Sequence, residues 1–265
     1  MLIAHLSDPH LRPEGRLYKG LVDSNAMFEA ALDALLALRP RPDLVLIGGD
    51  LVDEGEAGEY AQARRALARL PMPLLAIPGN HDDREGFRRG VTLAEPAAEA
   101  GPLHVDSGAR WPVRVLGLDV TVPGAHHGEA DAAALAWLSA RLAEDRTRPT
   151  LLLMHQPPVE TGVECIDAYM CRGGAPLAAV LEGASNLERV LCGHVHRFFQ
   201  ARFGGTLLTA CPSTATSIAL RLEPGAEGVS FLEPPAFLLH AWQEGRPMVT
   251  HWVPVGRFPG PFAFY

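Results

Sequence analysis

Short runs of consecutive apolar residues recur along the chain and predict buried strands. The five most apolar runs cover residues 2–7, 44–47, 74–77, 150–154 and 187–192. A run such as Leu44–Ile47, with no polar residue in alternation, is typical of a strand that is covered on both faces of its sheet. Weaker patterns predict two more strands at Leu103–Val105 and Val113–Leu118.

Apolar stripes with a helical period lie between these runs. They predict helices over residues 24–38, 56–70, 83–89 and 130–142, the first of them capped by Asp23, Ser24 or Asn25. Strands that alternate with helices indicate an α/β fold with a largely parallel sheet.

The pattern changes beyond residue 200, where stretches at 202–208, 236–242 and 248–253 are separated by glycine and proline and predict antiparallel strands. We therefore expect a core over residues 1–200, and strands in 201–265 that complete a second sheet packed on the first. The last residues, Pro259–Tyr265, are apolar, so we expect them to pack on the body or on another subunit. If these residues pack on another subunit, the protein is a homo-oligomer, and we expect a dimer or a larger assembly.

Composition narrows the range of functions. The chain has 265 residues with a net charge of −8, and this charge argues against binding a nucleic acid polymer through the whole surface. No apolar run approaches the roughly 20 residues that span a bilayer, and no basic segment precedes the first strand, so we expect a cytoplasmic protein without membrane contact. The four cysteines are too few and too irregularly spaced for a disulfide framework, although a pair between Cys165 and Cys171 stays open.

Candidate chemistry lies directly after the apolar runs. Asp50 follows Gly48-Gly49 at the end of the run 44–47, where open α/β sheets place their ligands. Because a carboxylate has two oxygens, Asp50 could hold two cations at once. Each of the other four runs also ends in groups that bind metals, and the full set is Asp8, His10, Asp50, Asn80, His155, His194 and His196.

Each of these groups also has a structural interpretation when it is taken alone. Asp8 could form a turn beside Pro9, Asn80 and Asp82 could cap a helix, and His155 could lie at the rim of the sheet. Burying so many polar groups without a partner would be costly, which favours a joint role. Nitrogen and oxygen donors without a thiolate suit two divalent or trivalent ions of Mn, Fe, Zn or Co better than Ca²⁺. We leave the adjacent pair His126-His127 out of this site, because it follows none of the five runs.

These residues resemble the motifs of the calcineurin-like metallophosphoesterases. The matching segments are Asp8-x-His10, Gly49-Asp50, Gly79-Asn80-His81-Asp82, His155 and Gly193-His194-x-His196. Their spacing is most similar to the class III cyclic-nucleotide phosphodiesterases, and within them to the bacterial glycerophosphodiesterase branch.

The resemblance implies a four-layer α/β/β/α sandwich and a centre of two metal ions. It implies that His81 faces the phosphoryl group of the substrate and that Asn80 also lies near the substrate. It also implies that Asp82 contributes to catalysis without binding a metal ion itself, by contacting the residues around the metal ligands. One ion would be held by Asp8, His10, Asp50 and His196, and the other by Asp50, Asn80, His155 and His194. It further implies hydrolysis of small phosphodiesters by in-line attack of a hydroxide formed between the ions.

The substrate is less well determined by the sequence. Arg12, Arg16, Lys19 or Arg172 could meet a phosphate, and Tyr18 or Tyr169 could support a base, which leaves cyclic nucleotides and glycerophosphodiesters as alternatives. The other possibilities are a non-catalytic interaction scaffold on the same fold, a phosphomonoesterase and a nuclease.

Overall fold

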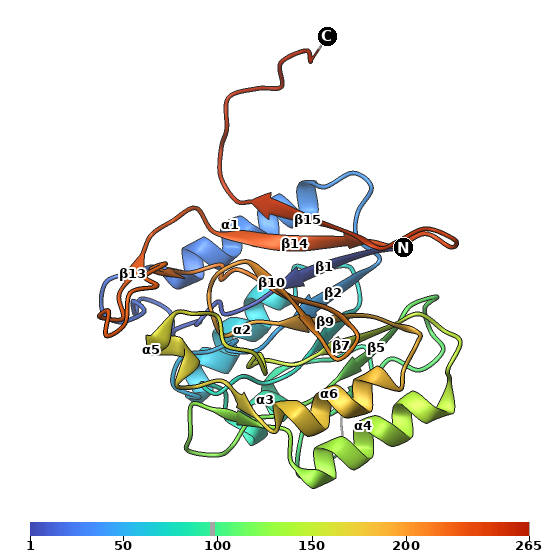
Figure 1. Ribbon diagram of the computed structural model, residues 1–265. Coiled ribbons are helices and arrows are strands. Elements are labelled where there is room, and N and C mark those ends of the chain that lie inside the picture. The colour runs from blue at the N-terminus through green and yellow to red at the C-terminus, as the bar shows by residue number, and fades with distance from the viewer. Residues whose placement is uncertain (96–98, 265) are drawn as a thin grey trace.

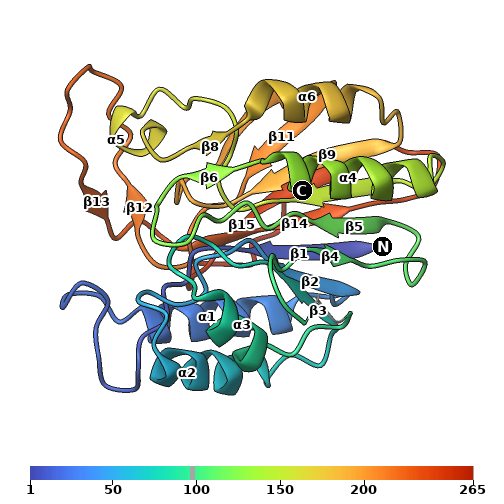
Figure 2. The same ribbon diagram turned by 90° about the horizontal axis from the view of Figure 1, so that it is seen from below.

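Two β-sheets pack face to face and are covered by helices on their outer sides. The computed structural model describes residues 1–95 and 99–264. Figure 2 shows the four layers, with α1 (Ser24–Ala37), α2 (Ala57–Leu67) and α3 (Arg84–Gly90) outside one sheet, and α4 (Ala132–Glu144) and α6 (Gly174–Glu182) outside the other. The expected α/β/β/α sandwich is therefore confirmed.

The first sheet has five strands. Their spatial order is β15 (Val249–Pro254), β14 (Ala236–Ala241), β1 (Leu2–Leu6), β2 (Leu44–Ile47) and β3 (Leu74–Ala76). The strands β1, β2 and β3 are parallel, and β14 and β15 add to them in antiparallel pairing.

The second sheet has six strands. Their order is β10 (Phe199–Phe203), β11 (Thr206–Ala210), β9 (Leu187–Cys192), β7 (Thr150–Leu153), β5 (Arg114–Gly117) and β4 (Val105–Asp106). The central strands β11, β9, β7 and β5 are parallel, so their carboxyl ends meet at one edge.

Smaller elements surround that edge. They are the helix α5 (Glu164–Asp167) and two short ladders, β6 (Gly128–Glu129) with β8 (Cys171–Arg172) and β12 (Ser217–Ile218) with β13 (Ser230–Phe231). They follow strands of the second sheet and lie together at one side of the molecule, beyond its carboxyl edge (Figure 2).

The strand β2 shows why a strand that is buried on both faces needs consecutive apolar residues. Leu44 and Leu46 belong to the core between the two sheets, whereas Val45 and Ile47 belong to the core under the helices of the first sheet. Successive side chains of a strand point to opposite faces, so a strand in an inner layer needs apolar residues at every position. The strand β7 follows the same rule, with Leu151 facing the other sheet and Leu152 facing the helices α4 and α6.

The strands beyond residue 200 differ in two ways from the expectation. The stretch 202–208 is not one strand, because Gly204 and Gly205 have φ angles of 55° and 79° and turn the chain between β10 and β11. The strands β10 and β11 do join the second sheet, but β14 and β15 extend the first sheet, where β14 covers the free edge of β1.

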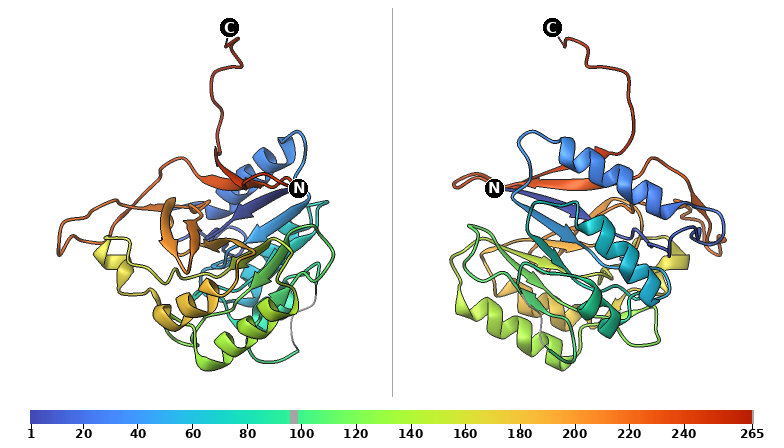
Figure 3. Two further views of the ribbon diagram at one scale, coloured as in Figure 1. Left: turned by 45° about the vertical axis from the view of Figure 1, so that its right-hand side comes forward. Right: turned by 180° about the vertical axis from the view of Figure 1, so that it is seen from behind.

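The described part of the C-terminal segment, residues 259–264, is exposed, and Tyr265 lies outside the described residues. Phe258, Phe262 and Phe264 are 58%, 80% and 88% exposed, and Figures 1 and 3 show the chain leaving the molecule after β15. The four cysteines are free, so Cys165 and Cys171 do not form a disulfide.

Candidate metal centre

The loops that follow β1, β2, β7 and β9 meet at the seam between the two sheets. They place two carboxylates and four imidazoles in a buried cluster, namely Asp8, Asp50, His10, His155, His194 and His196. The Oδ2 atom of Asp50 lies 3.2 Å from Nε2 of His155 and 3.8 Å from Nε2 of His10. The sequence-predicted residues of these four loops are therefore neighbours in space.

Asp50 belongs to two groups of candidate ligands at once. One group consists of Asp8, His10, Asp50 and His196, and the other of Asp50, His155 and His194. Within each group, one donor atom from every residue lies within 4.8 Å of the others. Each group also combines residues from both sheets, so the centre depends on how the sheets are packed.

Five of these residues have an unusual backbone conformation. The φ angles are 52° at Asp8, 45° at His10, 48° at Asp50, 70° at His194 and 55° at His196. Left-handed backbone is uncommon for residues other than glycine and costs of order 1–3 kcal/mol at each position. Such conformations persist where the surrounding structure fixes them, and they cluster at functional sites.

Close packing of the loops holds these conformations. The backbone N–H groups of Asp8 and His10 donate to the carbonyls of Gly49 and Asp50, each at 3.1 Å. A Cβ atom at Gly79 would collide with the Asp50 carboxylate. The loop after β3 can therefore approach the centre only with glycine at this position.

The histidines present their Nε2 atoms to the centre. Nδ1 of His155 is 2.6 Å from the carbonyl oxygen of Gly48, and Nδ1 of His196 is 2.8 Å from that of Thr216. These contacts place the ring proton on Nδ1 and leave Nε2 as the free donor to a metal, as is usual for metal-binding histidines. The Nε2 atoms of His155 and His194 are buried without a hydrogen-bond partner. This donor set fits a pair of cations.

The electrostatics of the cluster favour positive charge. Burial lowers the pKa of His155, but the nearby Asp50 and Asp8 carboxylates raise it more, to about 9. Burial raises the pKa of Asp50, yet His155 and the other histidines around it bring it well below its usual value. A proton on His155 thus neutralises the carboxylates, and a bound cation can take its place.

Asn80 lies at the mouth of the cluster. Its Nδ2 atom is 3.2 Å from Nδ1 of His126, and its Oδ1 atom accepts a long hydrogen bond of 3.4 Å from Nε2 of Gln156. An amide nitrogen can only donate, so His126 accepts through Nδ1, and the Asn80 oxygen is the amide atom available to a metal. Sequence reasoning excluded His126, but the structure places it beside the centre.

Asp82 is half-buried behind the centre, and it is not among the residues that line the cavity. Its carboxylate accepts from the backbone N–H groups of Gly79 at 2.9 Å and Leu51 at 3.1 Å. Burial, with a further contribution from Asp50, raises its pKa to about 7. Asp82 therefore joins the loops after β2 and β3.

His81 projects into the cavity from the loop after β3. Its Nδ1 atom lies 2.7 Å from the carbonyl oxygen of Asp53, which leaves Nε2 as the ring nitrogen available to a ligand. The Asp53 carboxylate is 3.5 Å from Nδ1 of both His81 and His10. Sequence reasoning missed Asp53, although its position three residues after Asp50 was a signal.

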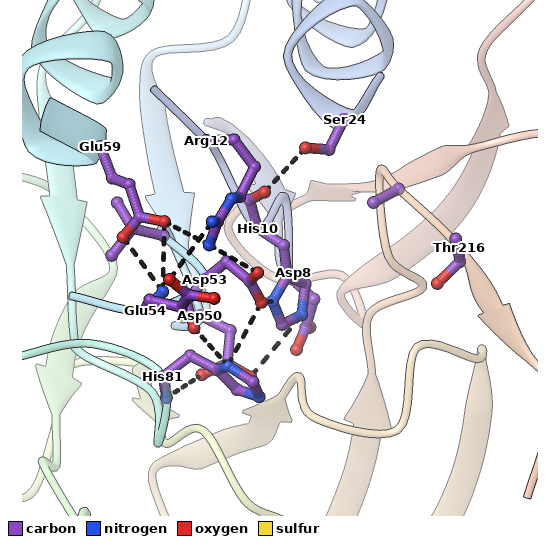
Figure 4. Close-up of polar contacts among 12 residues, drawn as sticks. Asp8, His10, Arg12, Ser24, Asp50, Asp53, Glu54, Glu59, His81 and Thr216 are labelled. Atoms are coloured by element: carbon purple, nitrogen blue, oxygen red, sulfur yellow. Dashed lines mark hydrogen bonds and ion pairs between the residues drawn. The ribbon is translucent and has the colours of Figure 1, made fainter. Parts of the chain in front are cut away.

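Asp53, which contacts His10 and His81, also forms an ion pair with Arg12. The Arg12 guanidinium lies 2.8 Å from the carboxylates of Asp53 and Glu59 and 3.2 Å from that of Glu54 (Figure 4). Glu59 is fully buried, and its carboxylate also accepts from the backbone N–H groups at the start of α2. Arg12 is thus committed to these carboxylates and is not a phosphate contact of the kind the sequence suggested.

The cavity over the centre measures about 320 Å³. Besides the candidate ligands, its walls carry Lys19, His126, Ile166, Tyr169 and Ile218. Tyr18 also reaches the cavity, but it is buried and stacks on His10, with ring centroids 4.8 Å apart, and therefore supports a metal ligand. Arg16 pairs with Glu56 at the surface instead of lining this cavity.

Comparisons with known proteins agree with this geometry. The model of the calcineurin-like phosphoesterase family matches residues 1–198. The chain belongs to the calcineurin-like phosphoesterases. Glycerophosphodiester phosphodiesterase GpdQ of Enterobacter lignolyticus is 31% identical over 265 residues, which cover 100% of this chain and 95% of that protein.

One further relative and one solved structure are similar to this chain. The 3',5'-cyclic adenosine monophosphate phosphodiesterase CpdA of Escherichia coli is 30% identical over 80% of this chain and 75% of its own length. The crystal structure of a dimetal phosphatase from Danio rerio has a TM-score of 0.69 at 13% identity, covering 97% of this chain and 96% of that one. The structural likeness shows the shared fold.

The helices of the phosphoesterase fold described here are short or polar. Among the described residues, none forms a helix that combines the length and apolar character required to cross a membrane.

Proposed function

We propose that this protein hydrolyses small phosphodiesters with the help of two bound metal ions. The observation that carries the proposal is the shared position of Asp50 between two groups of buried ligands from both sheets. Relatives along most of the chain are named as glycerophosphodiester and cyclic-nucleotide phosphodiesterases, which supports a diester as substrate.

In this proposal the residues divide between two ions. Asp8, His10, Asp50 and His196 would hold the first, and Asp50, Asn80, His155 and His194 the second. When bound, such ions lower the pKa of a water molecule and neutralise charge on phosphoryl oxygens. The donors suit Mn, Fe, Zn or Co.

The remaining site residues orient and stabilise the reacting group. Burial lowers the pKa of His81, but Asp50 and the Asp53 carbonyl raise it more, which favours the protonated ring. In that form Nδ1 donates to the Asp53 carbonyl, and Nε2 can donate a hydrogen bond to a phosphoryl or leaving-group oxygen. The amide of Asn80 lies between the ligand cluster and the cavity, so it can meet both an ion and the substrate. Asp82 holds the loop that carries both residues.

The walls of the cavity limit the substrate. A volume of about 320 Å³ accommodates a small diester and not a folded nucleic acid polymer. Lys19 provides a cationic side chain at this cavity, and Tyr169 with Ile166 provides an aromatic and apolar wall. Both glycerophosphodiesters and cyclic nucleotides are compatible with such a space.

A comparison of mono- and diester hydrolysis on one preparation tests the function. The protein is first stripped with a chelator and then reloaded with Mn²⁺ or Zn²⁺. We expect turnover of a bis-aryl phosphate that is lost on chelation, restored by metal, and faster than turnover of the matching aryl monoester. A faster monoester rate would indicate a phosphomonoesterase. Absence of metal-dependent turnover on any ester would favour the scaffold.

A further inference from the structure

Apolar side chains continue from one wall of the cavity to the surface of the protein. Ile166 and Ile218 line the cavity and belong to one apolar cluster with the buried Val163. Directly after Ile218 the chain carries two further leucines, Leu220 and Leu222, which are 61% and 60% exposed. An exposed apolar surface therefore begins at the cavity wall.

The loop that carries the two leucines packs beside α5. The backbone N–H of Gly225 donates to the Glu164 carboxylate at 2.6 Å. A Cβ atom at Gly162, just before α5, would lie 3.4 Å from Cδ2 of Leu222. Figure 2 shows this loop and α5 at the same end of the molecule. We call the row formed by Ile218, Leu220 and Leu222 the apolar track.

The charges around the apolar track are mainly negative. The surrounding segments, residues 160–170 and 217–231, contain five acidic residues and one basic residue, namely Glu160, Glu164, Asp167, Glu223, Glu227 and Arg221. Surfaces that bind anionic lipids or nucleic acids carry clusters of Lys and Arg, so these segments would repel such partners. A single uncharged alkyl chain is not repelled by them.

We propose that the apolar track binds an alkyl chain of the substrate, and that the preferred diesters are amphiphiles with one alkyl or acyl chain, of the lysophospholipid type. This inference rests on the proposed phosphodiesterase function, because the phosphate of such a molecule would lie over the candidate metal centre. Ile218 belongs to both the cavity and the track, so one molecule can occupy both.

The size and chemistry of the apolar track fit this occupant. Leucine side chains offer no hydrogen-bonding group to a base or a sugar, whereas they gain from contact with methylene groups. From Ile218 to Leu222 the chain advances by at most about 13 Å, which is comparable with an extended decyl chain. The track therefore favours an alkyl chain of intermediate length over a nucleoside.

The expected gain can be estimated from the burial of methylene groups. Complete burial of one methylene changes an equilibrium constant by up to about fourfold. The leucines of the track are exposed on one side, so we expect about half of that free energy, or about twofold per methylene. From a methyl to an octyl diester, kcat/KM should rise roughly a hundredfold. The gain should be mainly in KM, because the chain is bound equally in the ground state and the transition state.

A series of alkyl nitrophenyl phosphates, from methyl to octyl, tests the inference on the full-length, manganese-loaded protein. All substrates are used below the concentration at which they form micelles. Leu220→Ser and Leu222→Ser should each lower the octyl-to-methyl ratio of kcat/KM by about threefold, and the double variant by about tenfold. Because the ratio compares two substrates on one preparation, a general loss of activity or of metal cancels.

The matched control is Leu21→Ser, because Leu21 is 82% exposed in the loop after β1 and does not belong to the apolar track. This variant should keep the wild-type ratio. A methyl diester that is hydrolysed as fast as the octyl diester would overturn the inference and leave the diesterase function intact. A wild-type ratio in the double variant would overturn it as well.

Two further outcomes separate the remaining explanations. If the series is flat and Leu220→Glu lowers the mass measured by light scattering, a second copy of the chain covers the apolar track, which also overturns the inference. Absence of metal-dependent turnover of every diester, the methyl ester included, would refute the proposed function and this inference together.

Discussion

Nε2 of His155 lies 3.2 Å from Oδ2 of Asp50, although the two residues follow strands of different sheets. Asp50 follows β2 in the first sheet, and His155 follows β7 in the second. The same carboxylate also faces His10 at 3.8 Å. Asp50 thus occupies the position from which one side chain can serve both ligand groups.

Replacing Asp50 by Asn should remove more metal than the loss of any other single ligand. An amide has one oxygen donor and no charge, so it cannot bridge two cations. We expect the metal content of Asp50→Asn to fall from two ions per chain to one or fewer, and that of His196→Ala to one. Diesterase activity should fall roughly a thousandfold, since several kcal/mol of charge stabilisation are lost.

Mass spectrometry of the bound metals on dialysed protein measures this effect. Asp43→Asn is the matched control, because Asp43 precedes the opposite end of the same strand and bonds the backbone of Leu2. This variant should keep both ions. Two retained ions in Asp50→Asn would contradict the bridging role.

His81→Ala should slow poor leaving groups more than good ones. A donor to the leaving oxygen matters most where the leaving alcohol is basic. We expect the dependence of log kcat/KM on leaving-group pKa to become steeper in the variant, measured over a series of aryl and alkyl phosphodiesters. Equal slowing across the series would assign His81 to electrostatic stabilisation of the phosphoryl group alone.

His126→Ala should weaken the binding of one cation. The Nδ1 atom of His126 accepts from the amide of Asn80, which keeps the Asn80 oxygen free for the metal. Loss of such an orienting contact typically costs 10–100-fold in metal affinity. Calorimetric titration of the stripped protein with Mn²⁺ measures the two sites separately.

Two variants sharpen that experiment. His126→Gln retains an acceptor and should recover part of the affinity, whereas His127→Ala should leave both sites as in the wild type. If His126→Ala binds both ions as tightly as the wild type, the contact with Asn80 has no orienting effect.

Arg12→Met should destabilise the fold strongly. The substitution leaves the buried Glu59 and the half-buried Asp53 without the cation that both contact. Breaking a buried ion pair by removing one partner costs about 3–5 kcal/mol. Urea denaturation measures the loss, and Arg16→Met, which breaks an exposed pair with Glu56, should change the free energy of unfolding by less than about 0.5 kcal/mol.

The metal-free protein should lose stability as the pH falls below about 6.5. His5 is buried with both ring nitrogens unpaired, and burial lowers its pKa to about 3. The unfolded chain binds a proton at His5 near pH 6.5, but the folded chain does not, so acid favours unfolding by about 1.4 kcal/mol per pH unit between these values. The neighbouring His240, 5.8 Å from His5 between ring centroids, is shifted in the same direction by burial first and by His5 next.

Urea denaturation from pH 7.5 to 4 measures this slope. His5→Gln removes one titrating group. Below about pH 6.5 the free energy of unfolding should therefore fall less steeply with pH, by the equivalent of about one bound proton, and above pH 7 the slope should not change. An unchanged slope in this variant would show that His5 does not contribute to acid sensitivity.

The sequence predicts the layers of this fold well because the pattern of apolar residues in each strand shows whether one or both of its faces are buried. The run Leu44–Ile47 has apolar residues on both faces of the strand, and in the structure both faces are buried. Asp50 and His155 were found by the rule that open α/β sheets place ligand-binding groups just beyond the carboxyl ends of their strands. These expectations depend only on local pattern and general topology.

The residues that were missed depend on contacts between distant loops. His126 lies in the loop after β5, and β5 is parallel to β7 in the second sheet, so its loop reaches the same edge as His155. The strand Val113–Leu118 was predicted, and following its carboxyl end was the signal that could have found His126. The contact of Arg12 with Glu59, by contrast, depends on the packing of α2 against the first loop, and no pattern in the sequence indicates it.

The candidate ligands in each group come from both sheets, and this has a consequence for how the protein resists heat. Bound cations would fasten the two halves of the sandwich together, in addition to serving the reaction. A ligand that binds only the folded state raises its stability by RT ln(1 + [L]/Kd), which is about 2.7 kcal/mol at a hundredfold excess over Kd. A heat-challenge screen run in manganese-containing medium would therefore select for tighter cation capture as much as for better core packing.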